Sequence, residues 1–487
     1  MRTLLPALLF LLPLLLLGQP AAIQQTYPIS TTGFDAGRQV IALPDGSGYV
    51  ILGERVEAAN ANRRDIFLHR VNFTGVQNAQ GTFGLANASD IPGQGLIPTW
   101  NGWVFAGTRF SADNSNSNGL LVRTRLSGTS IASVWAKEVS IPGTSLVSFT
   151  DLDSLPDNGF IATGSATVGT QKRIIAAKFD VNGTVEWSQV YTLGTGRSIF
   201  VSSGGGNAFI AGSNKLLRIR TSSGETVWEK TLTPPAFGPA TGQVSVEFND
   251  MAAMPGKQIA VLGRIANNAA PGAVSAFHVA VWTQGGDFKW QRSYHQGPFN
   301  AANPNEGTSI IYHGSSARLI VGGIVDKKVT LSHLTNTGTL QTTYTSAAMG
   351  DQFAPAILLY NGHYAFTAGI ATTATNTNTF FYRSAVNFLG LSAPPGGGGN
   401  TGNNPETAAS MAIWPNPAQE MATLRIASTT GGPLRLRLLD ALGRLVWERE
   451  ETVFEGDNRV SIDLSNLTPG AYWVSVPGMR VVRVLKQ

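Results

Sequence analysis

The chain of 487 residues contains no cysteine. This absence excludes a disulfide framework, a zinc–thiolate site, an iron–sulfur cluster and a thiol nucleophile. Charged residues are also scarce, at 13% against roughly 25% in an ordinary soluble domain. Because 35 Lys and Arg face 30 Asp and Glu, the net charge of +5 forms no concentrated basic field. Nucleic acid is therefore not an expected partner.

Glycine and proline are abundant instead: 55 Gly and 25 Pro make up about one residue in six. This balance favours strands and turns over helices. Hydrophobic residues account for 43% of the chain, which is enough to fill a core and excludes disorder for the bulk of it. The chain is too long for one small core, so a large ring or several domains is expected.

Residues 1–22 have the pattern of a secretory signal peptide. Arg2 precedes an apolar run of 14 residues, Leu4 to Leu17, and small residues follow at 18–22. We expect cleavage within 18–25. A membrane anchor is the alternative, but the run is shorter than the roughly 20 residues that span a bilayer. We therefore expect no transmembrane segment after cleavage, and export through the periplasm.

The C-terminal part begins after a change in composition. Residues 393–409 are rich in Gly, Pro and Asn and have few apolar side chains to bury, which predicts a linker. Over 410–487, strand-like runs alternate with turn signals. Within 434–438 three leucines alternate with two arginines, so one face of that strand points to a core. Six or seven such strands predict a small immunoglobulin-like β-sandwich.

Four motifs within 410–487 carry a family resemblance. They are Ile413-Trp-Pro-Asn-Pro-Ala418, a tight turn around Gly443, the segment Asp463 to Tyr472 and a basic finish that ends at Lys486. With these motifs the segment resembles the type A C-terminal sorting domain of cargo of the type IX secretion system of Bacteroidota, with Trp414 in place of the family's usual Tyr. The resemblance implies that the type IX machinery is a partner, and that the protein reaches the outer surface of a Gram-negative cell or the medium. An ordinary immunoglobulin-like binding module is the alternative. The matching positions are Pro415, Asn416 and Pro417 in Ile413-Trp-Pro-Asn-Pro-Ala418, Gly443 in a tight turn, Leu464, Gly470 and Tyr472 in Asp463-Leu-Ser-Asn-Leu-Thr-Pro-Gly-Ala-Tyr472, and Lys486 in the basic finish.

The middle of the chain is repetitive. An apolar run closed by glycine recurs every 46 to 60 residues, and most copies are followed about 20 residues later by a strand, a Gly turn and an aromatic residue. Four short strands at a period near 50 are typical of a β-propeller blade. The sequence thus predicts an all-β protein, with a seven-bladed β-propeller over 23–392 followed by the sandwich. An array of separate sandwich domains is the alternative. The closing glycines are Gly53, Gly107, Gly164, Gly212, Gly263, Gly323 and Gly369.

The last repeat lacks a fourth strand. Ile23-Gln-Gln-Thr-Tyr27 has the spacing of the fourth strand Trp187-Ser-Gln-Val-Tyr191. We expect this N-terminal segment to complete the last blade, because pairing the two termini removes open edges from the ring. Residues 35–53 also resemble degenerate propeller repeats of exported Bacteroidota proteins, a resemblance that implies a fold and no single activity.

Four aspartates are speculative ligand-binding residues. Asp151 and Asp153 share one face of an innermost strand, and Asp35 and Asp250 are expected at comparable places in other blades. If they point into the channel, they could bind a cation or act as paired acids. The alternative is that they stabilise turns and strand ends. No residue is assigned as catalytic.

Neither a metal nor a cofactor is expected. The six histidines include no pair at i,i+2 or i,i+4, and His69, His278 and His333 fall on third strands, which indicates scaffold residues. Residues 113–119 alternate oxygen donors but lack the further carboxylates of a calcium loop, so a polar turn is favoured. Gly-x-x-x-Trp segments resemble the tryptophan docking repeats of quinoprotein dehydrogenases. Because they recur once per repeat, we interpret them as packing between blades.

Two functional hypotheses remain. The first is a secreted or surface-anchored, non-catalytic binding or adhesion protein for a polysaccharide or surface protein, using connections at 54–64, 108–118, 233–244 and 264–275 as a recognition face. The alternative is an extracellular polysaccharide hydrolase or lyase with its site in the propeller channel.

Overall fold

The structure is a computed structural model, and it describes most of the chain. The predicted signal peptide, the predicted linker and the Pro415–Pro417 and Gly443 positions of the sorting motif lie outside the described residues. The described ranges are 23–27, 34–43, 48–57, 60–72, 74–85, 87–99, 102–202, 204–269, 272–299, 305–313, 316–345, 352–360, 363–371, 377–383, 411–414, 418–428, 432–440, 445–453, 456–476 and 482–486.

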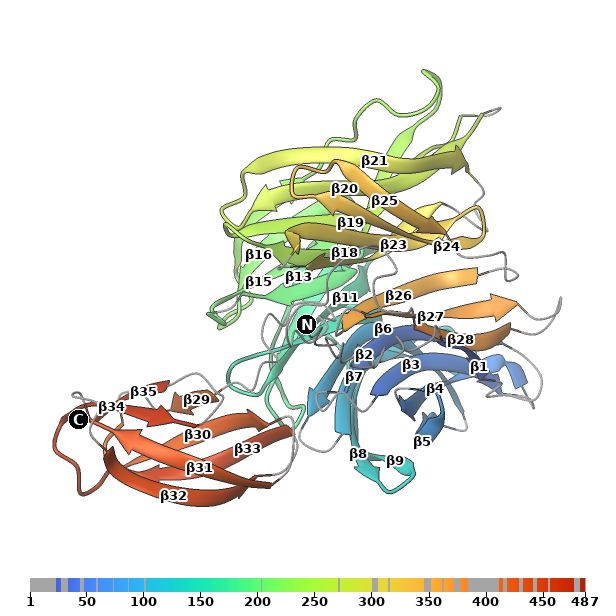
Figure 1. Ribbon diagram of the computed structural model, residues 1–487. Coiled ribbons are helices and arrows are strands. Elements are labelled where there is room, and N and C mark those ends of the chain that lie inside the picture. The colour runs from blue at the N-terminus through green and yellow to red at the C-terminus, as the bar shows by residue number, and fades with distance from the viewer. Residues whose placement is uncertain are drawn as a thin grey trace, which may run out of the picture.

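The chain up to residue 383 folds into antiparallel four-stranded units (Figure 1). In the first half, the strands are β1 (Ile23–Tyr27), β2 (Asp35–Ala42), β3 (Gly48–Glu57), β4 (Asn60–Asn72), β5 (Gln77–Phe83), β6 (Ala88–Thr99), β7 (Gly102–Ser111), β8 (Ser117–Ser127), β9 (Ser130–Val139), β10 (Ser145–Ser154), β11 (Phe160–Val168), β12 (Gln171–Phe179) and β13 (Val185–Leu193). In the second half, they are β14 (Ser198–Val201), β15 (Asn207–Gly212), β16 (Lys215–Arg220), β17 (Thr226–Thr231), β18 (Val244–Met254), β19 (Gln258–Asn267), β20 (Val274–Thr283), β21 (Phe288–Pro298), β22 (Glu306–His313), β23 (Arg318–Val325), β24 (Lys328–Thr335), β25 (Leu340–Thr345), β26 (Gln352–Tyr360), β27 (His363–Ala371) and β28 (Thr377–Arg383).

The units close into a ring. The inner strands β2, β6, β10, β14, β18, β22 and β26 contact one another in this order, and β26 contacts β2. A single parallel bridge between Gln80 and Ser130 links β5 to β9, so the first two units form one eight-stranded sheet. β1 pairs with β28, with Ile23 opposite Arg383, and completes the last sheet. The prediction that the N-terminal segment supplies this strand is confirmed, and the ring is a β-propeller.

The repeated glycines are explained by bulges in the inner strands. Inner strands β10 and β18 each carry a bulge opposite the glycine of the second strand. A Cβ atom at Gly164 would lie 1.8 Å from the carbonyl oxygen of Ser148, and one at Gly263 would lie 1.8 Å from that of Glu247. Only glycine therefore lets the inner strand approach this closely.

The apolar core lies between neighbouring sheets. Each large cluster takes side chains from two successive units, such as Phe209 with Phe248 and Trp282, or Phe105 with Leu68. Tyr27 and Phe381 of the last unit pack in the same way against the first. Burial of these aromatic side chains holds each unit to the next.

The tryptophans of the outer strands dock on the next unit, as the repeat predicted. The Nε1–H of Trp187 donates to the carbonyl oxygen of Thr221 at 3.0 Å, and its ring lies against Gly224, a turn residue with φ of 71°. Tyr191 donates to the carbonyl oxygen of Gly224 at 2.7 Å. Tyr27 makes the matching bond across the closure, to Gly75 at 2.5 Å. The same tyrosine–glycine hydrogen bond thus joins two internal units and the two ends of the ring.

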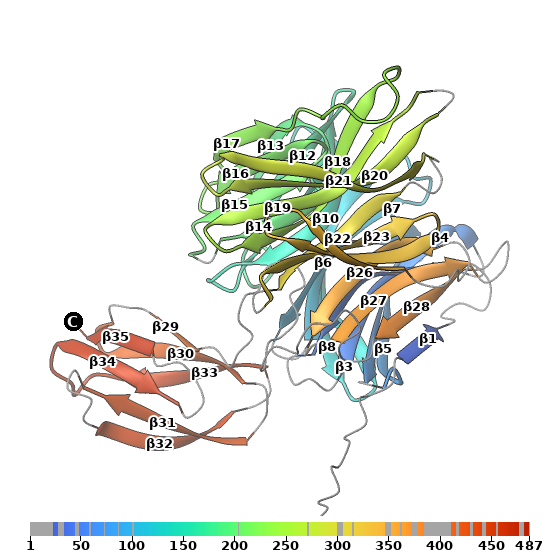
Figure 2. The ribbon, with the colours of Figure 1, turned by 45° about the horizontal axis from the view of Figure 1, so that its top comes forward.

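The C-terminal unit has two sheets (Figure 2). One has the order β29-β30-β33 and the other β32-β31-β34-β35, and their apolar side chains form a shared core that includes Leu424, Leu438 and Val474. The alternation over 434–438 is confirmed, since Leu436 and Leu438 are fully buried. The strands are β29 (Met411–Trp414), β30 (Met421–Ser428), β31 (Gly432–Leu439), β32 (Leu445–Val453), β33 (Gly456–Asp463), β34 (Gly470–Ser475) and β35 (Val482–Lys486).

Three of the expected long connections are shorter than predicted. Strands β3 and β4 occupy nearly all of 54–64, and β7, β8, β19 and β20 extend into 108–118 and 264–275. The strands run on because ladder pairing continues past the repeat glycines. The connection over 233–244 is a true loop between β17 and β18. Among the described residues there is no helix long and apolar enough to cross a membrane.

Candidate functional site

Asp151 and Asp250 occupy equivalent bulges on the inner strands β10 and β18. Asp151 Oδ2 accepts the backbone N–H of Ile199 at 2.7 Å, and Asp250 Oδ2 accepts that of Ile310 at 2.8 Å. Ser198, on the strand between them, donates to Asp250 Oδ1 at 3.2 Å. Each carboxylate therefore ties its inner strand to the inner strand of the next unit.

Asp153 acts in the same way one step further along β10. Its two oxygens accept the backbone N–H groups of Val201 and Ser154, both at 2.7 Å. Asp35 differs from the expectation, because it lies fully buried at the start of β2. The residue of β2 at the bulge is Gln39, whose amide donates to the carbonyl oxygen of Gln94 on β6 at 2.8 Å. We name Gln39, Asp151, Asp153, Ser198 and Asp250 the inner belt.

Burial governs the ionisation of the belt. It raises the pKa of Asp151 to about 7, with a further contribution from the charge of Asp250, and it raises the pKa of Asp250 to about 6. The pKa of Asp153 is raised well above its usual range for the same reason. The backbone donors oppose these shifts without cancelling them. Groups that titrate near neutrality can exchange protons with a ligand, so the belt is one candidate site.

The ring has a second candidate region on the face where the inner strands begin and the second strands end. We call it the loop face. Its first sector, from β2 to β9, is a network of ion pairs. Arg109 holds Asp90 through two bonds of 2.7 and 2.8 Å and Glu138 through one of 2.9 Å. Arg64 reaches the buried Glu54 at 3.0 Å.

The charges in this sector satisfy one another. Burial alone would raise the pKa of Glu54, but the Arg38 and Arg64 guanidinium groups together hold it below its usual range. Burial raises the pKa of Asp90 despite the bonds from Arg109. Because these acids are each paired with arginine, the sector leaves little uncompensated charge to attract a partner.

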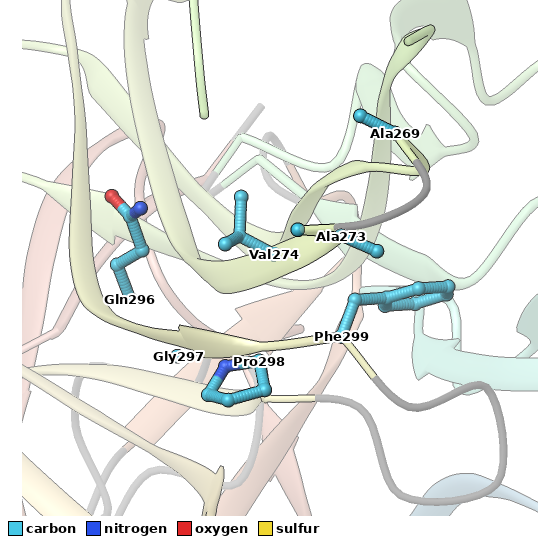
Figure 3. Close-up of a pocket in the computed structure, with 8 residues that line it drawn as sticks. Ala269, Ala273, Val274, Gln296, Gly297, Pro298 and Phe299 are labelled. Carbon is cyan, nitrogen blue, oxygen red and sulfur yellow. The ribbon is translucent and has the colours of Figure 1, made fainter. Parts of the chain in front are cut away.

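The second sector of the loop face is an open hollow of about 690 Å³ at the ends of β19 and β21 and the start of β20 (Figure 3). Gln296 and Phe299 lie on opposite sides of it, with Val274 between them. This volume is within the roughly 300–1,000 Å³ of small-molecule sites. Its eight lining residues are Ala269, Gly272, Ala273, Val274, Gln296, Gly297, Pro298 and Phe299.

Neighbouring residues restrain the walls of the hollow. Asn267 is buried, and its amide donates to the carbonyl oxygens of Phe237 and Pro239 at 2.7 and 2.9 Å, which ties the 233–244 loop to this site. The Arg264 guanidinium lies over the Phe299 ring, 5.6 Å from its centroid. Arg264 is itself bonded to Glu247 at 2.8 Å. The contact with Arg264 therefore restrains the Phe299 ring.

The buried histidines are part of the scaffold. His69, His278 and His333 lie on the third strands β4, β20 and β24, as predicted. Burial lowers the pKa of each to about 4. Within the described part of the chain, no group of three His, Asp or Glu side chains could hold a metal ion. Asp113 forms a polar turn, in which its Oδ1 accepts Ser111 Oγ at 2.7 Å and Ser115 Oγ at 2.8 Å.

The described part of the sorting motif is structural. Leu464 is fully buried in the sandwich core, and Tyr472 is nearly so. The Tyr472 hydroxyl donates to the carbonyl oxygen of Thr468 at 2.9 Å. Gly470 begins β34 opposite Lys486 on β35. These residues thus fix the last hairpin of the chain.

Comparison with known families decides what this unit is. Residues 412–484 match the family model of the secretion system C-terminal sorting domain. This match identifies the C-terminal unit as a sorting domain and indicates that the chain is cargo of the type IX secretion system. Such cargo is exported to the cell surface or the extracellular space, and the sorting domain implies an interaction with the type IX machinery.

The ring has structural relatives of low similarity. One is the β-propeller domain of Cps50 (Swd1) from Myceliophteria thermophila, with 10% identity, a TM-score of 0.42 and alignment over 75% of this chain and 100% of that one. The propeller of Dos1 has 10% identity, a TM-score of 0.45 and coverage of 75% and 94%. No curated protein matches this cargo chain. The propeller assignment therefore rests on its own sheet topology.

The sequence prediction named one wall of the hollow, within 264–275, and missed the other at Gln296–Phe299. A signal for it exists in the repeat spacing. The interval from Gly263 to Gly323, 60 residues, is the longest between repeat glycines. The extra residues extend β21 and its following connection, where the hollow lies.

Proposed function

We propose that this cargo is a non-catalytic binding protein, in which a seven-bladed β-propeller over 23–392 presents its loop face to a polysaccharide or surface protein. The cyclic order of the inner strands supports the blade count. The observation that carries the binding function is the hollow between β19, β20 and β21, a concave part of the loop face in which an arginine lies over the Phe299 ring.

The proposal includes the route of export. A signal peptide at 1–22 directs the chain to the periplasm of a Gram-negative bacterium, such as a member of the Bacteroidota. A linker at 393–409 then joins the propeller to an immunoglobulin-like sorting domain at 410–487. Lys486 bridges to Ala418 across the two sheets, so the chain end helps to close this domain.

Export is tested by removing residues 468–487, which takes away β34 and β35. We expect the truncated protein to accumulate in the periplasm, measured by cell fractionation and surface labelling. A full-length chain carrying Phe299→Ala is the control and should reach the surface. Surface appearance of the truncated chain would contradict the sorting role.

Binding through the loop face is tested with a lysine placed in the hollow. The full chain is incubated with envelope fractions and polysaccharide extracts, and bound protein is quantified. Ala273→Lys should lose most of the binding. Val185→Lys, at a 43% exposed site on the opposite rim, is the matched control and should retain it. Equal binding by both variants would contradict a role for the loop face.

The second candidate function is a channel hydrolase or lyase. It is favoured by one observation: Asp151 and Asp250 have pKa values near neutrality and approach a common serine, Ser198. Release of reducing ends or unsaturated products from a polysaccharide panel would support it. In that case Asp151→Asn should abolish release while the folded state persists.

A further inference from the structure

We infer that the hollow binds one uncharged sugar unit of a glycan, stacked against the ring of Phe299 and hydrogen-bonded to the amide of Gln296. The inference rests on the proposed binding function and deepens it, because it names the class of ligand and the two residues that recognise it.

The charge of the lining residues favours a neutral ligand. All eight described residues that line the hollow are uncharged. Arg264, whose guanidinium lies over the Phe299 ring, is already bonded to Glu247 and does not line the hollow. An anionic ligand would therefore lose its hydration without gaining an ionic partner, whereas a neutral ligand would not incur this cost.

The chemistry of the walls is the second argument. Phe299 presents an apolar ring on one side, and Gln296 presents an amide on the other (Figure 3). A glutamine amide carries both donors and an acceptor, so it can bond two neighbouring hydroxyl groups. A pyranose ring has an apolar C–H face and hydroxyl groups around its edge. The two walls match these two parts of a sugar.

The backbone that carries Gln296 is the third argument. His295 has φ of 58°, a left-handed conformation that is uncommon for residues other than glycine. Two residues of β21, His295 and Gln296, oppose the single residue Ala276 of β20 at this bulge. His295 Nε2 lies 2.7 Å from Ser332 Oγ on the next unit, which holds the bulge in place. The bulge, held by the bond between His295 and Ser332, thus places Gln296 at the hollow.

Openness supports a polymer over a free monosaccharide. Gln296 and Pro298 are exposed, so the hollow is not enclosed and a chain can continue past it in both directions. A site that covers only one face of its ligand binds weakly, and several copies on a cell surface would raise its avidity.

The test is calorimetric titration of the full chain with neutral oligosaccharides (gluco-, manno-, galacto- and xylo-series), alongside an anionic oligouronate and an unstructured proline-rich peptide. We expect binding of at least one neutral series. Phe299→Ala should weaken it at least tenfold and Gln296→Ala about fivefold, while Phe299→Trp retains it. Phe288→Ala is the matched control, since Phe288 is an exposed aromatic on the same strand at the opposite rim, and it should change affinity less than twofold.

Three outcomes would overturn the inference: no neutral series binds, only the oligouronate or the peptide binds, or Phe299→Ala binds as the parent does. These outcomes are distinguishable from failure of the proposed function. If Ala273→Lys still abolishes binding to envelope fractions, the loop face is the binding site and only the ligand class is wrong. If the parent binds no fraction, the proposed function itself fails.

Discussion

The inner belt and the hollow differ in what their polar groups do. In the belt, both oxygens of Asp151, Asp153 and Asp250 accept backbone N–H groups, and each carboxylate links two inner strands. In the hollow, Gln296 is exposed, and the Arg264 guanidinium lies over the Phe299 ring. The belt has the perturbed pKa values, yet its groups are committed to the framework. The hollow has no ionisable lining residue among those described, and its groups face solvent.

A shifted pKa therefore indicates that a group is buried, and it does not by itself indicate a functional site. The carboxylates are shifted because ring assembly takes them out of water, and backbone donors compensate them only in part. A binding role requires groups that can exchange water for ligand, and the hollow provides them.

Closure of the ring supports both regions, and its loss should have the largest effect. A chain without residues 23–27 leaves the β28 edge unpaired and removes the Tyr27 bond to Gly75. We expect the free energy of unfolding to fall by several kcal/mol, measured by urea denaturation of the mature protein. An unchanged midpoint would contradict a closed ring.

Loss of one belt carboxylate should follow in size. Asp153→Ala leaves the buried N–H of Val201 without its acceptor. We expect a loss of about 2–3 kcal/mol, measured by thermal and urea unfolding. Glu225→Ala, at an exposed surface position, is the control and should change stability by less than about 0.5 kcal/mol. Equal effects would mean that the belt bond is energetically unimportant.

The belt should also give stability a pH dependence. Burial raises the pKa of Asp250 to about 6, above the roughly 3.9 of an unfolded chain. The folded state therefore holds this proton more tightly, and the stabilising contribution is present below about pH 4 and is lost as pH rises through 6. Asp250→Asn does not titrate, so its deficit against the parent should shrink between pH 4 and 7 by roughly 2 kcal/mol.

Comparison with the parent removes the opposing contribution of the histidines. His278, with a pKa lowered to about 4, loses stabilising energy as pH falls from 6.5 to 4 in parent and variant alike. A deficit that grows with pH would contradict the raised pKa of Asp250.

The smallest stability effect should come from the tyrosine bonds of the outer rim. Tyr27→Phe keeps the ring packing and removes the bond to Gly75, which should cost about 1 kcal/mol. Tyr191→Phe removes the matching bond to Gly224 inside the chain. Similar losses in chemical denaturation would show that closure and internal docking are equivalent, and a loss confined to Tyr191→Phe would show that β1 is loosely held.

Much of the framework could be predicted from the sequence because it repeats. A glycine such as Gly164 or Gly263 occurs in each repeat where the inner strand approaches closely, and a tryptophan such as Trp187 occurs where one unit docks on the next. Repetition carried over to the N-terminal strand as well. The hollow could not be predicted in this way, because it occurs where one unit departs from the repeat, at the bulge of His295. The prediction that Asp35 lies at a place comparable to Asp151 was wrong for a related reason. Asp35 is close to the bulge of β2 in sequence, but Gln39 occupies the bulge.

The most direct test of the account measures stability and binding on the same two variants. Asp151→Asn and Phe299→Ala are prepared in the full chain, and each is assayed for its unfolding midpoint and for binding to envelope polysaccharide. The account predicts that Asp151→Asn lowers the midpoint and retains binding, while Phe299→Ala retains the midpoint and loses binding. The reverse pattern would contradict it and would move the functional site to the channel.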